Sequence, residues 1–322
     1  MCRNKQTTSA CCRAAAIAAL LAAPVFVAAQ TAAHAEVLQA QVLAPAHFVA
    51  PTIIPIAAPG GAPAATPAVA LPQTKHAALP PSAQPVPSSL GDCTAPAQLS
   101  RFDRPLVHTM RRLGSGEPLT IVAIGSSSTA GAGASSPAAS YPNRLAAELR
   151  QHFPEHDITV LNRGVNGEET NNMMARFAAD VIAAHPQLVL WQVGTNSVLR
   201  DRPLDKHEIA LREGIDELKA ARADVVLIDP QFAPAVIAKS ETPGMVEQIA
   251  LAAKDENVDL YRRYAAMRDW HDVQHLAFDK FISPDQLHMN DWGYACMARL
   301  LGTAIVEAAS RPIASAAAHS AR

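Results

Sequence analysis

The stretch Leu119-Thr-Ile-Val-Ala-Ile-Gly125 decides the fold class of this 322-residue chain. It is a short, almost continuously apolar run that ends in glycine. Such runs are typical of strands in a parallel sheet, because helices bury both faces of each strand. Four similar runs follow along the chain, at 158–164, 188–194, 224–230 and 258–261. We therefore expect five parallel strands.

Segments with the apolar spacing of helices alternate with these runs. They lie at 142–152, 169–184, 206–221, 243–257 and 290–309. Repeated alternation of strand and helix predicts an α/β fold, a three-layer α/β/α sandwich around a central five-stranded parallel sheet. Ligands of such sheets bind beyond the carboxyl ends of the strands. The residues that follow Gly125, Gly164 and Gly194 are therefore the first candidates for a functional site.

The composition narrows the class of protein. Lys and Arg number 27 against 29 Asp and Glu, so the net charge of −2 argues against a nucleic-acid binder. With 49% hydrophobic and 17% charged residues, the chain can build a core and is not disordered throughout. Apolar runs of about 18 residues are absent beyond the N-terminus, so we expect no internal membrane span.

The N-terminus has the organisation of a secretory signal peptide over residues 1–35. Residues 1–13 carry three basic residues and no acid, and residues 14–29 are apolar and rich in alanine. The stretch Ala33-His34-Ala35 supplies a small-residue cleavage site. This pattern predicts an exported protein, periplasmic or secreted, with no membrane span after cleavage. An uncleaved N-terminal anchor is the alternative.

A spacer is expected to follow over 36–92. Of the 25 prolines, 11 lie between positions 45 and 87. Proline fixes φ and lacks an N–H donor, so this stretch is expected to be extended and disordered. We expect one folded domain over 93–312 and a disordered tail over 313–322.

Removal of the signal peptide leaves two cysteines, Cys93 and Cys296. Export permits a disulfide between them, which would join the start of the domain to its last helix. Such a long loop gives a stabilisation of at most about 5 kcal/mol in the chain-entropy model. Two buried thiols are the alternative.

Polar blocks follow three of the predicted strands. In Gly125-Ser126-Ser127-Ser128-Thr129, a serine at the strand end can be held exposed beside backbone N–H groups, although a helix-capping turn by itself explains the block better. In Gly164-Val165-Asn166-Gly167, two glycines let the backbone turn its N–H groups into the crevice. In Gly194-Thr195-Asn196-Ser197, the asparagine amide can donate to an oxyanion or form an Asx turn.

A fourth block, Asp285-Gln-Leu-His288, lies before the last predicted helix. A carboxylate at this spacing can accept from one imidazole nitrogen and fix the tautomer of the ring. The other nitrogen is then free to take a proton from a hydroxyl. The alternative is an ordinary histidine, since the chain has 12 of them.

The order and placement of these blocks resemble those of the SGNH/GDSL hydrolase family over about residues 119–306. The first block of that family reads Gly-Asp-Ser-x-Thr. Here Ser126 replaces the acid, and the family nucleophile falls on Ser127. The oxyanion glycine of the second block falls on Gly167.

The two remaining family blocks match with one departure. The third block usually reads Gly-x-Asn-Asp, and its asparagine falls on Asn196 while Ser197 replaces the trailing acid. The last block, Asp-x-x-His, matches at Asp285 and His288. All four residues that give the family its name are thus present.

The resemblance implies a flavodoxin-like SGNH hydrolase fold and acyl transfer to water through a serine ester, without a cofactor. It implies that His288, oriented by Asp285, activates Ser127. It also implies an oxyanion hole that is made by the N–H of Ser127, the N–H of Gly167 and the amide of Asn196. The expected substrate is a short-chain acyl ester, above all an acetyl ester, of a small molecule or a glycan.

Two other functions use the same residues differently. An O-acyltransferase would pass the acyl group to a polysaccharide or peptidoglycan hydroxyl in place of water. A non-catalytic binding module of the cell envelope would explain the replaced acids at Ser126 and Ser197, but not the intact Ser127, Asp285 and His288.

A metal site is a weaker hypothesis. His271 and His275 are four residues apart and could offer one face of a helix to zinc. The sequence nearby offers no third ligand, and the His-Glu-x-x-His pattern is absent. We therefore expect no metal.

Overall fold

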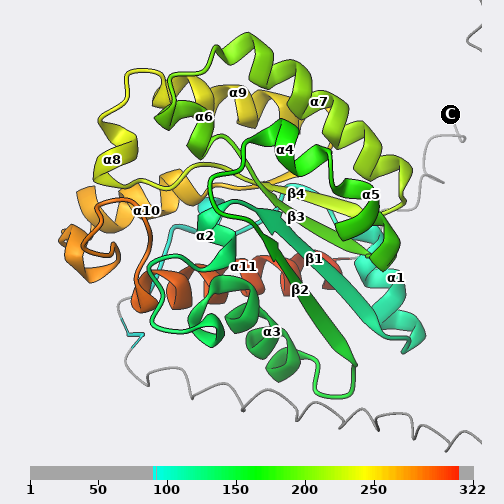
Figure 1. Ribbon diagram of the computed structural model, residues 1–322. Coiled ribbons are helices and arrows are strands. Elements are labelled where there is room, and N and C mark those ends of the chain that lie inside the picture. Colours follow the sequence, from blue (N-terminus) through cyan, green and yellow to red (C-terminus); the bar gives the residue numbers. More distant parts are fainter. Residues whose placement is uncertain (1–89, 92, 312–322) are drawn as a thin grey trace, which may run out of the picture. The chain divides into compact units, whose positions relative to one another are not determined.

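The protein is described by a computed structural model that covers residues 90–91 and 93–311 (Figure 1). In this part of the chain, one parallel sheet has the strand order β2-β1-β3-β4-β5. Its strands are β1 (Leu119–Gly125), β2 (Ile158–Gly164), β3 (Leu188–Gln192), β4 (Asp224–Ile228) and β5 (Asp259–Tyr261). Each strand lies within one of the five predicted runs, so the predicted sheet is confirmed.

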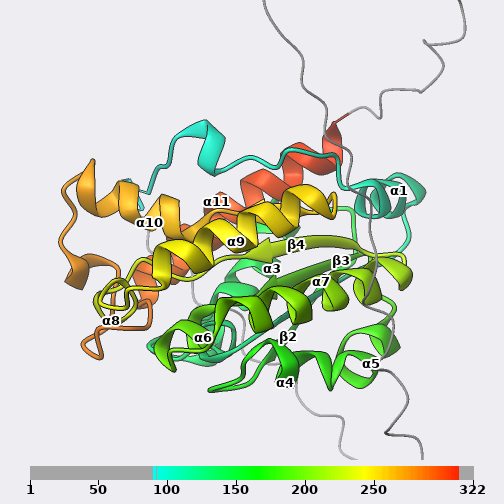
Figure 2. The same cartoon turned by 90° about the horizontal axis from the view of Figure 1, so that it is seen from above.

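Helices cover both faces of this sheet, which gives the three layers predicted (Figures 1 and 2). One face is covered by α1 (Val107–Ser115), α3 (Tyr141–His152) and α11 (Asp291–Ser310). The other face is covered by α4 (Thr170–Met174), α5 (Phe177–Asp180), α7 (Leu204–Ala220) and α9 (Thr242–Asp255). Shorter helices follow the strands: α2 (Ser127–Ala130), α6 (Thr195–Leu199), α8 (Pro234–Ile237) and α10 (Arg263–Asp272). Single 3₁₀ turns are η1 (Ala97–Leu99), η2 (Pro137–Ala139), η3 (Ile182–Ala184) and η4 (Phe278–Lys280).

The apolar runs of the sequence become strands because every side chain in them has a core to enter. Ile121 and Ala123 of β1 enter the core under α3 and α11. Val122 and Ile124 point to the opposite face and enter the core under α7 and α9. Burial of one such side chain stabilises the fold by roughly 1.5–3 kcal/mol. Two separate cores therefore hold the sheet in place.

The predicted helix over 169–184 is wrong as a single helix. It is broken into α4, α5 and η3, and the first break lies at Arg176 (Figure 1). The backbone of Arg176 leaves the helical region, with φ −116° and ψ 8°. Its guanidinium instead reaches the ends of β1 and β2, where Nη2 donates to the Arg163 carbonyl over 2.7 Å. The apolar spacing survives the break, which is why the sequence predicts one continuous helix.

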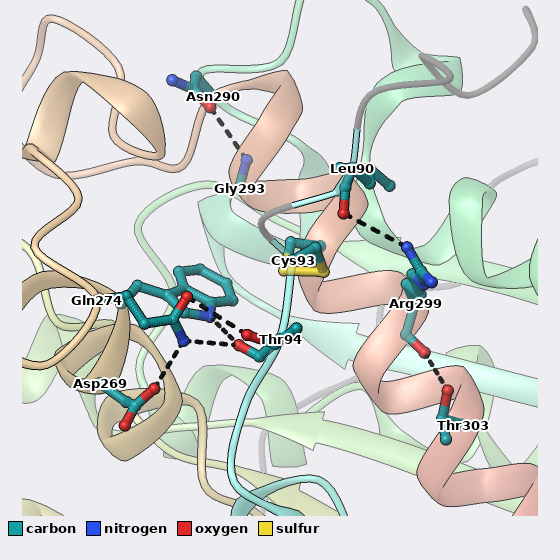
Figure 3. Close-up of a disulfide and its surroundings, with 11 residues drawn as sticks. Leu90, Cys93, Thr94, Asp269, Gln274, Asn290, Gly293, Arg299 and Thr303 are labelled. Carbon is teal, nitrogen blue, oxygen red and sulfur yellow. Dashed lines mark hydrogen bonds between the residues drawn. A yellow bond between two sulfur atoms is a disulfide. The ribbon is translucent and has the colours of Figure 1, made fainter.

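A disulfide joins Cys93 to Cys296 in α11, across 203 positions of sequence (Figure 3). The predicted bridge is therefore confirmed. Hydrogen bonds strengthen the same junction, because Trp270 Nε1 and Gln274 Nε2 both donate to the carbonyl of Thr94, over 2.9 and 3.1 Å. The segment at the start of the domain is thus fixed to the two helices α10 and α11.

The remaining boundary predictions lie outside the described residues. These are the signal peptide over 1–35, nearly all of the spacer over 36–92 and the tail over 313–322. Leu90, at the end of the predicted spacer, is buried against the core. Among the described residues, none of the helices is both long and apolar enough to cross a membrane.

Candidate active site

Ser127 is the accessible member of the three consecutive serines. It begins α2 directly after β1, and its side chain is partly exposed, whereas Ser126 and Ser128 are each only 1% exposed. Gly164 allows α2 to lie against the end of β2, because a Cβ at this position would approach the Ala130 nitrogen to 2.0 Å. The packing therefore selects one serine of the three and turns it outward.

The structure brings Ser127, His288 and Asp285 into one chain of hydrogen bonds. His288 Nε2 lies 2.8 Å from Ser127 Oγ, and His288 Nδ1 lies 2.6 Å from Asp285 Oδ2. Asp285 Oδ1 accepts from Ser283 Oγ over 2.7 Å and from the backbone N–H groups of Leu287 and His288 over 2.9 Å each. Both oxygens of the carboxylate are thus fixed in direction.

The charge of Asp285 is stabilised by these bonds. Burial alone would raise the pKa of this carboxyl, but the hydrogen bonds from His288, Ser283 and Leu287 outweigh it and hold the pKa well below its usual range. An ionised carboxylate accepts the proton on His288 Nδ1, so we assign the tautomer with a free lone pair on Nε2. That lone pair faces the hydroxyl of Ser127, and the arrangement can therefore deprotonate this serine.

Asn196 lies in α6, which is bonded to the loop that carries Gly167. Asn196 follows β3, and its Nδ2 donates to the Glu168 carbonyl over 2.8 Å. Gly167 has φ +79°, in the left-handed region that favours glycine. Among the described residues, the N–H groups of Gly167 and Ser127 have no protein acceptor. Free donors of this kind can bind the negative oxygen of a reacting carbonyl.

An ion pair missed by the sequence reasoning holds the Gly167 loop. Glu168 binds Arg176, with 2.7 Å between Nη2 and Oε2, and the two side chains are only 15% and 16% exposed. Arg176 Nη2 also donates to the carbonyls of Arg163 and Gly125, over 2.7 and 3.4 Å. Glu168 and Arg176 are eight residues apart, which is not a pairing distance on a helix, so the pattern gives no signal of this contact.

The histidines considered for zinc do not share a helix face. Helix α10 ends at Asp272, and His275 lies beyond it with φ +57°. The ring of His271 stacks on Phe278 with 4.1 Å between centroids. Within the described part of the chain, three or more His, Cys, Asp or Glu residues never group in a way that could hold a metal ion.

Two curated proteins are similar to part of this chain. An acetylxylan esterase of Geobacillus stearothermophilus is 33% identical over 94 residues, which are 26% of this chain and 43% of the relative. An arylesterase of Vibrio mimicus is 32% identical over 95 residues, 30% of this chain and 46% of the relative. The matches span less than half the length of either relative.

Solved structures agree with the fold. A two-domain esterase active on acetylated mannans superposes with a TM-score of 0.57 at 20% identity, over 66% of this chain and 56% of the other. The resemblance to SGNH/GDSL hydrolases is confirmed at the level of the superfamily. A model of the Non-GDSL lipase-like family matches residues 92–311, and the chain therefore belongs to this family.

Proposed function

We propose that this protein is a serine esterase that hydrolyses short-chain acyl esters, above all acetyl esters, on carbohydrates. The observation that carries the proposal is the hydrogen-bonded chain from Ser127 Oγ through His288 to Asp285. The names of the relatives support the class of substrate, since one is an acetylxylan esterase and a structural neighbour is active on acetylated mannans.

The mechanism begins with Ser127. Its Oγ attacks the ester carbonyl carbon as His288 Nε2 takes the hydroxyl proton, and Asp285 stabilises the imidazolium that forms. The tetrahedral intermediate then expels the alcohol, which receives the proton from His288. A water molecule next attacks the acyl-serine, and His288 again accepts and returns the proton. The products are the carboxylic acid, the alcohol and free Ser127.

The oxyanion of both intermediates is bound by three donors. They are the N–H groups of Ser127 and Gly167 and the side-chain amide of Asn196. Because a primary amide carries two N–H donors, Asn196 can hold the Glu168 carbonyl with one and the oxyanion with the other. Each such donor lowers the barrier by about 3 kcal/mol.

We also propose that the protein acts outside the cytoplasm. The pattern of residues 1–35 supports export, as does the disulfide between Cys93 and Cys296, because structural disulfides persist mainly in oxidising compartments. An acetylated polysaccharide or cell-wall ester would be available there.

The test is a substrate series with the full chain. p-Nitrophenyl esters from acetyl to long acyl chains are compared with acetylated xylooligosaccharides, and released acetate is measured with and without an added unacetylated glycan. We expect rapid acetate release into water and falling rates with longer chains. Transfer to the glycan without release would establish an acyltransferase instead. A folded protein with no turnover and no labelling by a fluorophosphonate would establish a binding module.

A further inference from the structure

A row of buried amide and hydroxyl side chains lies behind the site. Gln192 and Gln231 are each 1% exposed, and Thr195 is 3% exposed. Polar groups remain in a core when they are hydrogen-bonded, and these three bond to one another. Their role in the proposed reaction does not follow from the Ser–His–Asp chain itself.

The first half of the row starts at Ser126. Its N–H and its hydroxyl both donate to Gln192 Oε1, over 2.9 and 3.0 Å. On the other side of the same amide, Gln192 Nε2 donates to Thr195 Oγ1 over 3.4 Å. Ser126 is the residue that replaces the usual acid of the first block. In this chain the residue at that position therefore bonds to a neutral side-chain amide, that of Gln192 in β3.

The second half of the row ends beside the histidine. Thr195 Oγ1 donates to Gln231 Oε1 over 3.0 Å, and Gln231 Nε2 donates to the Leu287 carbonyl over 3.3 Å. Arg263, itself 1% exposed, donates from Nη2 to the same Gln231 Oε1 over 3.0 Å and from Nε to the Asp229 carbonyl over 2.9 Å. The row thus runs unbroken between two loops of the site.

Arg263 sets the direction of every bond in the row. A guanidinium only donates, so the amide oxygen of Gln231 must face it and the NH₂ group is left for Leu287. The Thr195 hydroxyl then gives its proton to Gln231 and accepts from Gln192. This leaves the oxygen of Gln192 for the two donors of Ser126 and for the Thr129 hydroxyl, which donates over 3.4 Å. Bonds that run in one direction polarise one another and resist reorientation.

The ends and the middle of the row have one feature in common. Each contact residue directly precedes a functional residue in the sequence: Ser126 before Ser127, Thr195 before Asn196, and Leu287 before His288. We propose that Gln192, Thr195 and Gln231 are positioning residues that hold the nucleophile, the oxyanion donor and the histidine in register. The proposal rests on the proposed esterase function and assigns these residues no contact with substrate.

The reason for such a device is the sensitivity of the reaction to geometry. The three functional residues lie in three separate elements, namely α2, α6 and the loop before α11, and a displacement of 1 Å can lower a rate by about 100-fold. The row joins these three elements through a single set of bonds behind them. It therefore acts on turnover more than on substrate binding.

The test compares two glutamines with the same chemistry at opposite ends of the sheet. Gln231→Met breaks the row between Thr195 and Leu287. Gln187→Met is the control, because the side chain of Gln187, like that of Gln231, accepts through Oε1 and donates through Nε2 to a backbone carbonyl. Gln187 accepts from the Thr120 N–H over 2.9 Å and donates to the His185 carbonyl over 2.8 Å, but it is only partly buried and lies directly before β3, away from the site. With p-nitrophenyl acetate, we expect kcat to fall 10- to 100-fold in Gln231→Met with KM within threefold, and to stay within twofold in Gln187→Met.

A second pair of variants covers the case in which Gln231→Met does not fold. Thr195→Val removes the hydroxyl at nearly constant volume and should lower kcat about tenfold. Thr195→Ser restores the hydroxyl and should recover most of that loss. A loss that is equal in Thr195→Val and Thr195→Ser would show that packing, not the row of bonds, is responsible.

A readout without substrate separates this proposal from the esterase itself. The proton between His288 Nδ1 and Asp285 should give a downfield NMR resonance in the wild type and in Gln187→Met, and a shifted or broadened one in Gln231→Met. If the wild type hydrolyses no ester, the proposed function fails, while this resonance still decides the positioning role. An unchanged resonance together with unchanged kcat in Gln231→Met would overturn the proposal.

Discussion

His288 Nε2 lies 2.8 Å from Ser127 Oγ, although 161 positions of sequence separate the two residues. The parallel sheet brings them together. Ser127 begins the helix at the carboxyl end of β1, and His288 lies in the loop that leads into α11, which packs against the same sheet (Figure 1). The contact thus depends on the fold as a whole, and several consequences can be measured.

Asp285→Asn should lower kcat by about 10³- to 10⁴-fold with little change in KM, because an amide no longer fixes the Nδ1–H tautomer of His288. Steady-state kinetics with p-nitrophenyl acetate measure the effect. Asp269→Asn is the control, since Asp269, on α10, accepts from Gln274 over 2.7 Å and takes no part in the site. A loss of less than tenfold in Asp285→Asn would argue that the carboxylate does not orient the ring.

Arg176→Gln should lower kcat about tenfold, because the loop that carries Gly167 loses its attachment to the end of β2. Arg212→Gln is the control, as Arg176 pairs with two acids beside the site and Arg212 pairs with three acids at the more exposed surface of α7 and α9. Exposed ion pairs contribute about 0–1 kcal/mol, so this control should retain both its activity and its thermal midpoint. Equal losses of activity in the two variants would refute the role of Arg176.

Asp229 should make stability depend on pH. Burial raises the pKa of this carboxyl to about 7, although the N–H of Tyr264 and the charge of Arg263 act in the opposite direction. Because the folded-state pKa exceeds the unfolded-state value of 3.8, the folded protein holds the proton more tightly. The stabilisation from Asp229 is therefore full below about pH 4 and is lost as the pH rises through about 7.

The measurement is the difference in urea midpoint between Asp229→Asn and the wild type at pH 5 and pH 8. The urea midpoint of the variant should rise relative to that of the wild type as the pH increases. Burial also raises the pKa of Asp259, to about 6, and lowers that of His207, but both groups are present in both proteins and cancel in the difference. A difference that does not change with pH would contradict the assignment.

Removal of the disulfide should lower stability without removing activity. Cys93→Ser combined with Cys296→Ser should reduce the free energy of unfolding by about 2–5 kcal/mol. The reason is that the unfolded chain is no longer cross-linked across 203 positions and so gains conformational entropy. Turnover at 25 °C should remain, since neither cysteine bonds to Ser127, Asp285 or His288. Added reductant should destabilise the wild type and leave the double variant unchanged. An effect of reductant on both proteins would point to another cause.

The strands and the contact between Asp285 and His288 could be predicted because each has a local signal. Leu119–Gly125 is apolar at almost every position, which is typical of a strand whose two faces are both covered by helices. Asp285 and His288 are three residues apart, and their contact is confined to one loop. Helix ends and breaks gave no such signal, since Arg176 leaves the helix for partners that are distant in sequence.

The choice among Ser126, Ser127 and Ser128 and the supporting contacts could not be derived from the sequence without the resemblance. Burial separates the serines, and burial depends on how α2 lies against β2. Gln192 and Gln231 are ordinary residues in the sequence, and their bonds join segments that are distant in sequence. Local patterns together with the resemblance thus predicted the groups proposed to react, whereas the groups that support them required the structure.

The most direct test of the account compares the three neighbouring serines. Hydrolysis of p-nitrophenyl acetate and labelling by a fluorophosphonate, followed by the mass of the intact protein, are measured for Ser126→Ala, Ser127→Ala and Ser128→Ala. Ser127→Ala should lose turnover by about 10⁶-fold and take up no label while it keeps its fold. The other two variants should still be labelled. Turnover that survives in a folded Ser127→Ala protein would contradict the central claim that Ser127 is the nucleophile.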